Sequence, residues 1–368
     1  MRPRTRLLTL ITGASILGSL SPNAAAAEQR PRIDYFSAPF DIRRVLDWGD
    51  RPVWSRDGTK IAFTESDTEQ SHAHELDLRT RQERCLTCQW GDKGLVERIY
   101  YLPDGSFLIT AGPDQASTEL YWMPQSLSRP PQPLGVQAVG EVAITRSTAS
   151  PRDERRPRPA SPRGDDVRHP ATAPDGGFRL AAWSVRGGLW TGTIAHDGSH
   201  AAITSRREIK IPLEGLIEPY NFLRNDQALT FYHIDDIDGV LNGEMHEVNL
   251  RTGAVTNLSR DPAHNEAHSF PNERFGLEES NRISDPDGPD RGVSGHARYG
   301  DKPFDLFVVD YERSRNIRRL TYVSDIGGEA NQSVPAPDGR RVAFVLDPRA
   351  SGPLAGSGGL YLGEFRRP

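Results

Sequence analysis

Residues 51–63 read RPVWSRDGTKIAF, which combines a short strand, an Asp-Gly turn and an apolar strand. Asp-Gly between two such runs is a strong signal for a tight hairpin. The unit recurs, mostly at intervals of about 40–50 residues, and such a period is typical of propeller blades. Its copies are ERIYYLPDGSFLI at 97–109, a degenerate EVAITRS at 141–147, EPYNFLRNDQALTF at 218–231, EAHSFPNERFGL at 266–277 and EANQSVPAPDGRRVAF at 329–344.

Two more candidate strands follow each unit. They are clearest in HELDLRTRQERCLT at 74–87, GEMHEVNLRTGAVTNL at 243–258 and FDLFVVDYERSRNIRRLT at 304–321. Four short antiparallel strands make up a propeller blade. We therefore predict an all-β fold, a six-bladed β-propeller of four-stranded antiparallel blades. It would fill residues 40–368, after a linker at 28–39.

The predicted ring needs a closing strand. The last unit ends with GLYLGEF at 359–365, a third strand with no fourth strand after it. Near the N-terminus, DIRRVL at 41–46 matches NIRRLT at 316–321, the last strand of the preceding unit. We predict that residues 41–46 complete the last blade, which would remove an open sheet edge.

Two segments lengthen the repeat. Residues 147–177 are rich in Pro, Arg and Asp, a composition that does not bury a core, so we predict a disordered insertion in the third blade. Residues 281–301 are polar and indicate a second insertion.

The N-terminus has the pattern of an export signal. Three arginines within the first six residues precede an apolar run at 7–20, and AAAA at 24–27 offers the small residues of a cleavage site. The apolar run is shorter than the roughly 20 residues that span a bilayer. We expect residues 1–27 to be a cleaved signal peptide and the mature protein to be periplasmic or secreted, without a membrane span.

Charge argues against a nucleic-acid partner. Loss of the three signal-peptide arginines would change the formal net charge from −5 to about −8. Binding to a phosphate backbone needs a basic face, so we expect no DNA or RNA ligand.

The sequence has two cysteines, Cys85 and Cys88. In an oxidising compartment this spacing predicts a local disulfide. A thioredoxin-like redox pair would need an α/β context, which is missing, and two thiolates alone do not make a zinc site.

Five glutamates occupy one equivalent position in the repeat, just before the innermost strand. In a closed ring they would converge on one rim of the central channel and form an acidic funnel. Like charges raise one another's pKa, and glycoside cleavage uses a protonated acid beside an ionised carboxylate. Capping of backbone amides and binding of a divalent cation are the other two interpretations. The five are Glu97, Glu141, Glu218, Glu266 and Glu329.

A polar cluster lies around one of these glutamates. His264, Glu266 and His268 form H-x-E-x-H, and strand alternation would place all three side chains on one face, where they could ligate a metal or transfer protons. The spacing differs from the helical H-E-x-x-H zinc signature. Surface loop histidines would show the same pattern. Further candidates are His233, Glu278 and Glu279.

The units WSRDGTKIAF and APDGRRVAF, with the strand endings RRLT and TNLS, resemble those of TolB-like six-bladed propellers over roughly residues 40–365. A narrower resemblance is to secreted members of the saponin hydrolase type, which implies removal of a sugar from a triterpenoid glycoside. At Asn272-Glu273 the chain departs from the usual Asp-Gly. This narrower resemblance rests on RCLTC at 84–88, NEAHSFPNERFGLEESNR at 265–282, FDLFVVD at 304–310 and RRLTYVSDIGGEANQSVPAPDGRRVAF at 318–344.

Two functions follow from these observations. In the first, the propeller binds a small glycoside, or a protein or glycan of the cell envelope, at its acidic funnel. In the second, it is a glycoside hydrolase for saponin- or glucuronide-type substrates, with Glu218 and Glu266 as acid and base or nucleophile and His268 tuning one of them. We expect a monomer without a cofactor, and a divalent cation in the funnel is left open. The ligand-binding candidates are Glu97, Glu141, Glu329, His264 and His233.

Overall fold

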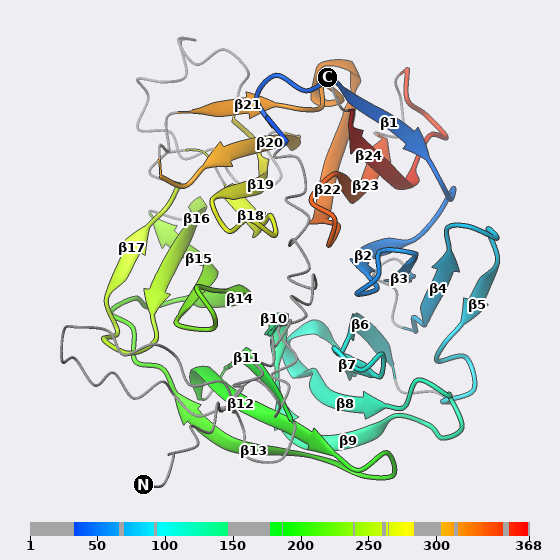
Figure 1. The fold of residues 1–368 in the computed structure, drawn as a ribbon, viewed down its shortest axis with the longest axis vertical. Helices are drawn as coiled ribbons and strands as arrows, with labels where there is room; N and C mark the ends of the chain where they lie inside the picture. Colours follow the sequence, from blue (N-terminus) through cyan, green and yellow to red (C-terminus); the bar gives the residue numbers. More distant parts are fainter. Residues whose placement is uncertain are drawn as a thin grey trace, which may run out of the picture. The chain divides into compact units, whose positions relative to one another are not determined.

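The computed structural model describes residues 33–65, 70–91, 94–145, 177–185, 187–237, 240–259, 263, 265–282, 303–312, 316–348 and 353–366. In these residues, 24 strands form six four-stranded antiparallel sheets, which confirms the predicted six-bladed β-propeller (Figure 1). The predicted signal peptide at 1–27, His264 and nearly all of the predicted insertion at 147–177 lie outside the described residues.

Each blade follows one sequence unit. Blade 1 contains β2 (Asp50–Trp54), β3 (Lys60–Thr64), β4 (Ala73–Asp77) and β5 (Glu83–Cys85); blade 2 contains β6 (Leu95–Tyr101), β7 (Phe107–Gly112), β8 (Glu119–Met123) and β9 (Gln132–Gln137); blade 3 contains β10 (Val139–Ile144), β11 (Phe178–Ser184), β12 (Gly188–His196) and β13 (Ala201–Glu208). Blade 4 contains β14 (Leu216–Leu223), β15 (Ala228–Ile237), β16 (Val240–Asn249) and β17 (Val255–Asn257); blade 5 contains β18 (Asn265–Ser269), β19 (Phe275–Ser280), β20 (Asp305–Asp310) and β21 (Ile317–Arg319); blade 6 contains β22 (Gly328–Pro335), β23 (Arg341–Pro348), β24 (Gly359–Phe365) and β1 (Phe40–Arg44). Two short 3-10 turns, Gln115–Ser117 and Ser324–Ile326, lie between strands of the described chain.

The first strand of every blade faces a common axis. Each of β2, β6, β10, β14, β18 and β22 contacts the first strands of both neighbouring blades, so these six strands form a closed ring around this axis (Figure 1). The apolar core lies between the blades, with one cluster of buried side chains at each of the six interfaces. This arrangement places the main apolar core between the blades.

The Asp-Gly turns have the conformation that their sequence predicts. In blade 1, Gly58 adopts a left-handed φ of 67°, and the Asp57 carboxylate accepts the backbone N–H of Thr59 at 3.1 Å. In blade 5, Asn272 and Glu273 replace Asp-Gly, and Glu273 adopts the left-handed φ of 61° that glycine favours. The turn therefore survives the departure from the repeat.

The predicted closing strand is confirmed. β1 pairs antiparallel with β24 over Phe40–Arg44, so it begins one residue earlier and ends two residues earlier than predicted. Residues 33–39, part of the predicted linker, pack against the propeller: Tyr35 is 4% exposed, and its hydroxyl donates to the Gly339 carbonyl at 2.7 Å. No helix in the described residues is long and apolar enough to cross a membrane.

Replacement of Gly363 by valine tests the seam between β1 and β24. A Cβ atom at Gly363 would overlap the ring of Phe40, so we expect the free energy of unfolding to fall by about 1–3 kcal/mol. Urea unfolding followed by tryptophan fluorescence measures this loss. In a Phe40→Ala background the overlap is absent and the same substitution should cost less; equal costs in both backgrounds would contradict this account of the seam.

Candidate functional site

The five predicted glutamates lie inside the first strands and not just before them. Each is the second or third residue of its strand, because pairing with the second strand starts earlier than the sequence suggested. Glu218 is opposite Tyr232, Glu266 is opposite Glu279, and Glu329 is opposite Asp347. The glutamates therefore belong to the wall of the channel and not to its rim.

Irregular strand pairing shapes this wall. Among the described strands, five of the six first strands shift register against their second strand, and β18 is the regular one. At three of these bulges Arg51, Gly140 and Gln332 adopt left-handed φ values of 49°, 71° and 52°. Left-handed backbone at residues other than glycine costs free energy and tends to persist at functional sites.

Arg98 of β6 is the central cation of the wall. Its Nη1 atom lies 2.6 Å from Glu141 Oε1 of β10 and donates to Gln332 Oε1 of β22 at 2.6 Å, so Arg98 connects blades 2, 3 and 6. Arg98 is 8% exposed and Glu141 is 5% exposed, which makes this ion pair a buried one. The Tyr100 hydroxyl donates to the other oxygen of Glu141 at 2.7 Å.

The ion pair keeps Glu141 ionised. Burial raises the pKa of Glu141, but Arg98, His268 and the Tyr100 hydroxyl outweigh this effect and hold the pKa below its usual range. Glu97, which is 4% exposed, behaves differently. Burial raises its pKa more than Arg98 and Arg51 lower it.

Glu218 and Glu266 form a coupled pair around Tyr220. The Tyr220 hydroxyl donates to Glu266 Oε1 and lies 3.4 Å from Glu218 Oε2. Burial, and next the charge of Glu266, raise the pKa of Glu218 to about 8. Burial also raises the pKa of Glu266, although the bond from Tyr220 opposes this shift. Both shifts favour a proton on this pair of carboxyls.

His268 and Glu279 lie next to this pair. The ring of His268 lies 4.4 Å from the ring of Tyr220 in an edge-on contact, so Glu266 and His268, two residues apart on β18, both contact Tyr220. Glu279 of β19 accepts the backbone N–H of Ser333, and burial, followed by the charge of Glu266, raises its pKa.

A cavity of about 390 Å³ lies beside these residues. Its polar wall includes Arg51, Arg98, Glu141, Tyr220 and His268, which stand on the first strands of the ring. With Arg56, three arginines and one glutamate line the cavity, so its charge is mixed and not purely acidic. Its remaining wall is mainly apolar and includes Pro103, Pro271 and Pro337, which follow the first strands.

The other predicted site residues lie apart from this group, or outside the residues that the structure describes. His233 Nε2 contacts the carbonyl oxygen of Glu214, and its ring lies 5.7 Å from the ring of His246. These contacts do not connect His233 with Glu218 or Glu266. Glu329 is half-buried on β22, and His264 is outside the described residues.

Four of the residues that organise the site were not predicted from the sequence. Arg51, Arg98, Tyr100 and Tyr220 carry no repeated signal of their own. For Tyr220 a weak signal exists, because it follows Glu218 by two residues as His268 follows Glu266.

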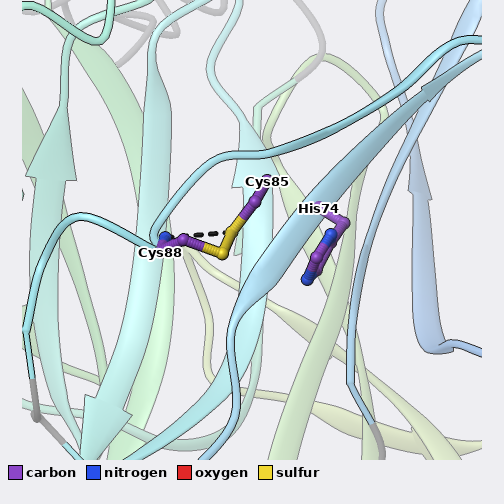
Figure 2. A group of neighbouring side chains, drawn as sticks. All are labelled: His74, Cys85 and Cys88. Carbon is purple, nitrogen blue, oxygen red and sulfur yellow. Dashed lines mark hydrogen bonds between the residues drawn. A yellow bond between two sulfur atoms is a disulfide. The ribbon is translucent and has the colours of Figure 1, made fainter.

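Cys85 and Cys88 form a disulfide, with their Cα atoms 5.7 Å apart (Figure 2). His74 of β4 lies beside it and is the register partner of Cys85. In the part of the chain that the structure describes, this is the only place where three His, Cys, Asp or Glu side chains bring ligand atoms within 4.8 Å of one another. The divalent cation considered for the central funnel stays a prediction.

No protein-family model matches this chain, and no curated protein matches its sequence. Solved structures do match. The putative TolB from Agrobacterium tumefaciens is 15% identical with a TM-score of 0.47, over 76% of this chain and 79% of that one. TolB from Acinetobacter baumannii is 14% identical with a TM-score of 0.44, over 77% of this chain and 54% of that one. An oligogalacturonate lyase from Vibrio parahaemolyticus is 13% identical with a TM-score of 0.43, over 90% and 97%.

With these identities and with TM-scores below 0.5, the matches carry no argument about the ligand or the reaction. The narrower resemblance to saponin hydrolases stays a prediction, and so do the ligand and the reaction. In fold, this chain is similar to TolB-like six-bladed propellers.

Proposed function

We propose that this chain is an exported binding propeller whose central cavity holds a small amphipathic glycoside. The cavity carries the proposal, because its volume of about 390 Å³ is within the range of small-molecule sites. Apolar walls with a few convergent polar groups are the usual composition of such sites.

The two parts of the wall suit the two parts of a glycoside. Pro103, Pro271 and Pro337 offer an apolar surface for an aglycone. Three arginines and one glutamate line the cavity, so its lining carries a net positive charge, and an arginine fork matches the geometry of a carboxylate. The wall therefore favours an acidic sugar of the glucuronide type over a neutral sugar.

Glycoside hydrolysis is the second candidate, and the Glu218–Glu266 pair favours it. A raised pKa leaves Glu218 able to protonate a leaving-group oxygen below pH 8 or so, and Glu266 can act as nucleophile or base. Tyr220 contacts both carboxyls and also lines the cavity, so it joins the pair to the ligand site.

One experiment distinguishes the two candidates. Aryl glucuronides, aryl glucosides and triterpenoid glycosides are titrated calorimetrically into the mature protein, and released sugar is measured in the same samples. We expect glucuronides to bind about 10-fold more tightly than glucosides, since a charge-assisted hydrogen bond contributes about 1.5–3 kcal/mol. His268→Ala should weaken binding, whereas His200→Ala, on an exposed turn, should not.

The possible results distinguish a binding protein from a glycoside hydrolase. Equal affinity for charged and neutral sugars, or no effect of His268→Ala, would reject the proposed ligand site. Sugar release that Glu218→Gln and Glu266→Gln each reduce by about 10²-fold or more would establish hydrolysis. Binding without release in the wild type would leave a binding protein.

A further inference from the structure

We propose that Cys85 and Cys88, after reduction of their disulfide, form with His74 a binding site for a thiophilic divalent cation, with Zn²⁺ the metal expected. The spacing Cys-x-x-Cys supplies two thiolates, and His74 supplies the third ligand that the sequence alone did not place beside them. Two thiolates and an imidazole are a common donor set for zinc. Ligand atoms of all three residues already lie within 4.8 Å of one another.

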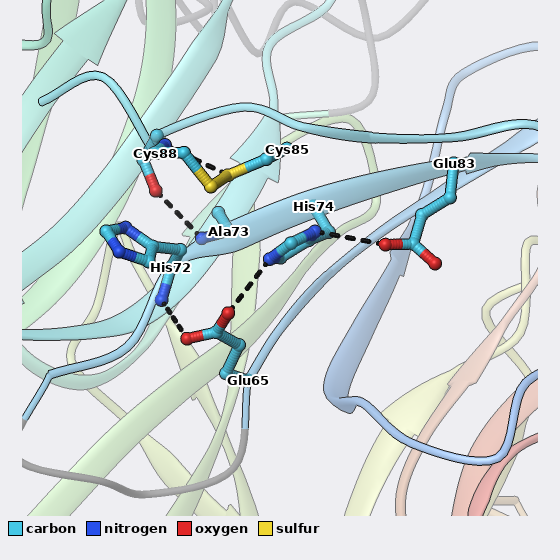
Figure 3. The surroundings of a disulfide bond; sticks show 8 residues. Glu65, His72, Ala73, His74, Glu83, Cys85 and Cys88 are labelled. Carbon is cyan, nitrogen blue, oxygen red and sulfur yellow. Dashed lines mark hydrogen bonds and ion pairs between the residues drawn. A yellow bond between two sulfur atoms is a disulfide. The ribbon is translucent and has the colours of Figure 1, made fainter.

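Bonds other than the disulfide hold this geometry. His74 and Cys85 are register partners in the β4–β5 pair. The Leu86 N–H donates to the Ala73 carbonyl at 2.8 Å, and the Ala73 N–H donates to Thr87 Oγ1 at 2.9 Å. Figure 3 shows the second of these bonds beside the disulfide. The loop of 86–88 is therefore tied to β4 whether or not the sulfur–sulfur bond exists.

The imidazole of His74 is fixed in place. The residue is 8% exposed, and its ring lies 4.8 Å from the ring of Trp48 and 5.7 Å from the ring of Phe63. Nε2 lies 3.1 Å from Glu65 Oε1, and Nδ1 lies 3.2 Å from Glu83 Oε1 (Figure 3).

Glu65 and Glu83 are partners of the His74 imidazole. Whichever ring nitrogen binds the metal, the other nitrogen keeps a carboxylate partner, which is the outer-shell arrangement usual for zinc-bound histidine. Neither Glu65 nor Glu83 belongs to the group whose ligand atoms lie within 4.8 Å of one another, so water would supply the fourth ligand of a tetrahedral site.

Reduction of the disulfide and binding of the metal are two separate steps. An external dithiol gives two electrons and two protons to the Cys85–Cys88 bond and becomes a disulfide itself. Zn²⁺ then displaces the two thiol protons into water and binds the thiolates with neutral His74. Cys88 is exposed, so a reductant can reach the bond. Because the disulfide closes a loop of only four residues, its chain-entropy contribution to folding is small.

Cobalt titration tests the site. Protein reduced with a phosphine and then desalted without oxygen is titrated with Co²⁺, which reports thiolate ligation through a near-ultraviolet charge-transfer band. We expect one Co²⁺ per chain in the reduced protein, displacement by one Zn²⁺, and no such band in the oxidised protein. His74→Phe keeps the packed ring but removes both nitrogens, and it should weaken Co²⁺ binding at least about 10-fold.

His72→Phe is the matched control, since His72 lies two residues away and outside the ligand group. It should leave the affinity unchanged. Circular dichroism checks folding, and His74→Gln replaces His74→Phe if that variant is unfolded. A reduced wild type without the charge-transfer band, or a folded His74 variant that binds Co²⁺ as tightly as wild type, would overturn the proposal.

Discussion

Arg98→Met is expected to lower the free energy of unfolding by about 3–5 kcal/mol, because it leaves Glu141 buried without its cation. Arg98 lies 2.6 Å from Glu141, and both residues are less than a tenth exposed. Methionine keeps much of the length and apolar contact of arginine, so the loss comes mainly from the unpaired charge. Urea unfolding at neutral pH measures the change.

A double variant separates charge from packing. In Arg98→Met with Glu141→Gln the ion pair is replaced by two neutral side chains, and the Tyr100 hydroxyl can still donate to the amide oxygen. We expect it to regain most of the stability that the single variant loses, since neutral replacements of buried ion pairs are often tolerated. If the double variant is as unstable as Arg98→Met, the ion pair is not the reason that Arg98 matters.

Glu218→Gln is expected to remove part of the pH dependence of folding. The pKa of Glu218 is about 8 in the folded protein against an ordinary 4.5, so the folded state holds this proton more tightly than the unfolded state. The free energy of unfolding therefore falls as pH rises between these two values, by up to about 1.4 kcal/mol per pH unit from this group. Glutamine does not titrate, so the variant should show a shallower decline.

Urea unfolding of the wild type and of Glu218→Gln at pH 5, 6, 7 and 8 gives the comparison. The difference between the two proteins should grow with pH in favour of the variant. Glu214→Gln, an exposed glutamate just before β14, is the control and should follow the wild type. Parallel curves for Glu218→Gln and wild type would show that Glu218 is not protonated in the folded protein.

The fold was largely readable from the sequence because local signals repeat in it. Each hairpin turn carries its own residues, such as Asp57-Gly58, and the closing strand shares its pattern with residues 316–321. Even Asn272-Glu273 keeps the turn, because Glu273 tolerates the left-handed backbone.

The site was readable only in part, because bulges change which way side chains point. Val96 and Ile99 pack in the same apolar layer although they are three residues apart, since the register shifts between them. Strict alternation would put them on opposite faces. The sequence pattern does not locate such a shift, and the position of Arg98 depends on it. The repeat predicted the glutamates but did not predict Arg98, the cation that pairs with Glu141.

The pairing of β1 with β24 also determines when the molecule can be finished. Phe40 and Phe365 are register partners although they are far apart in the sequence, so blade 6 cannot form until the ribosome has made the chain as far as β24. Contacts of such long sequence separation form slowly. During synthesis β1 therefore remains unpaired, and the ring closes only when β24 has been made.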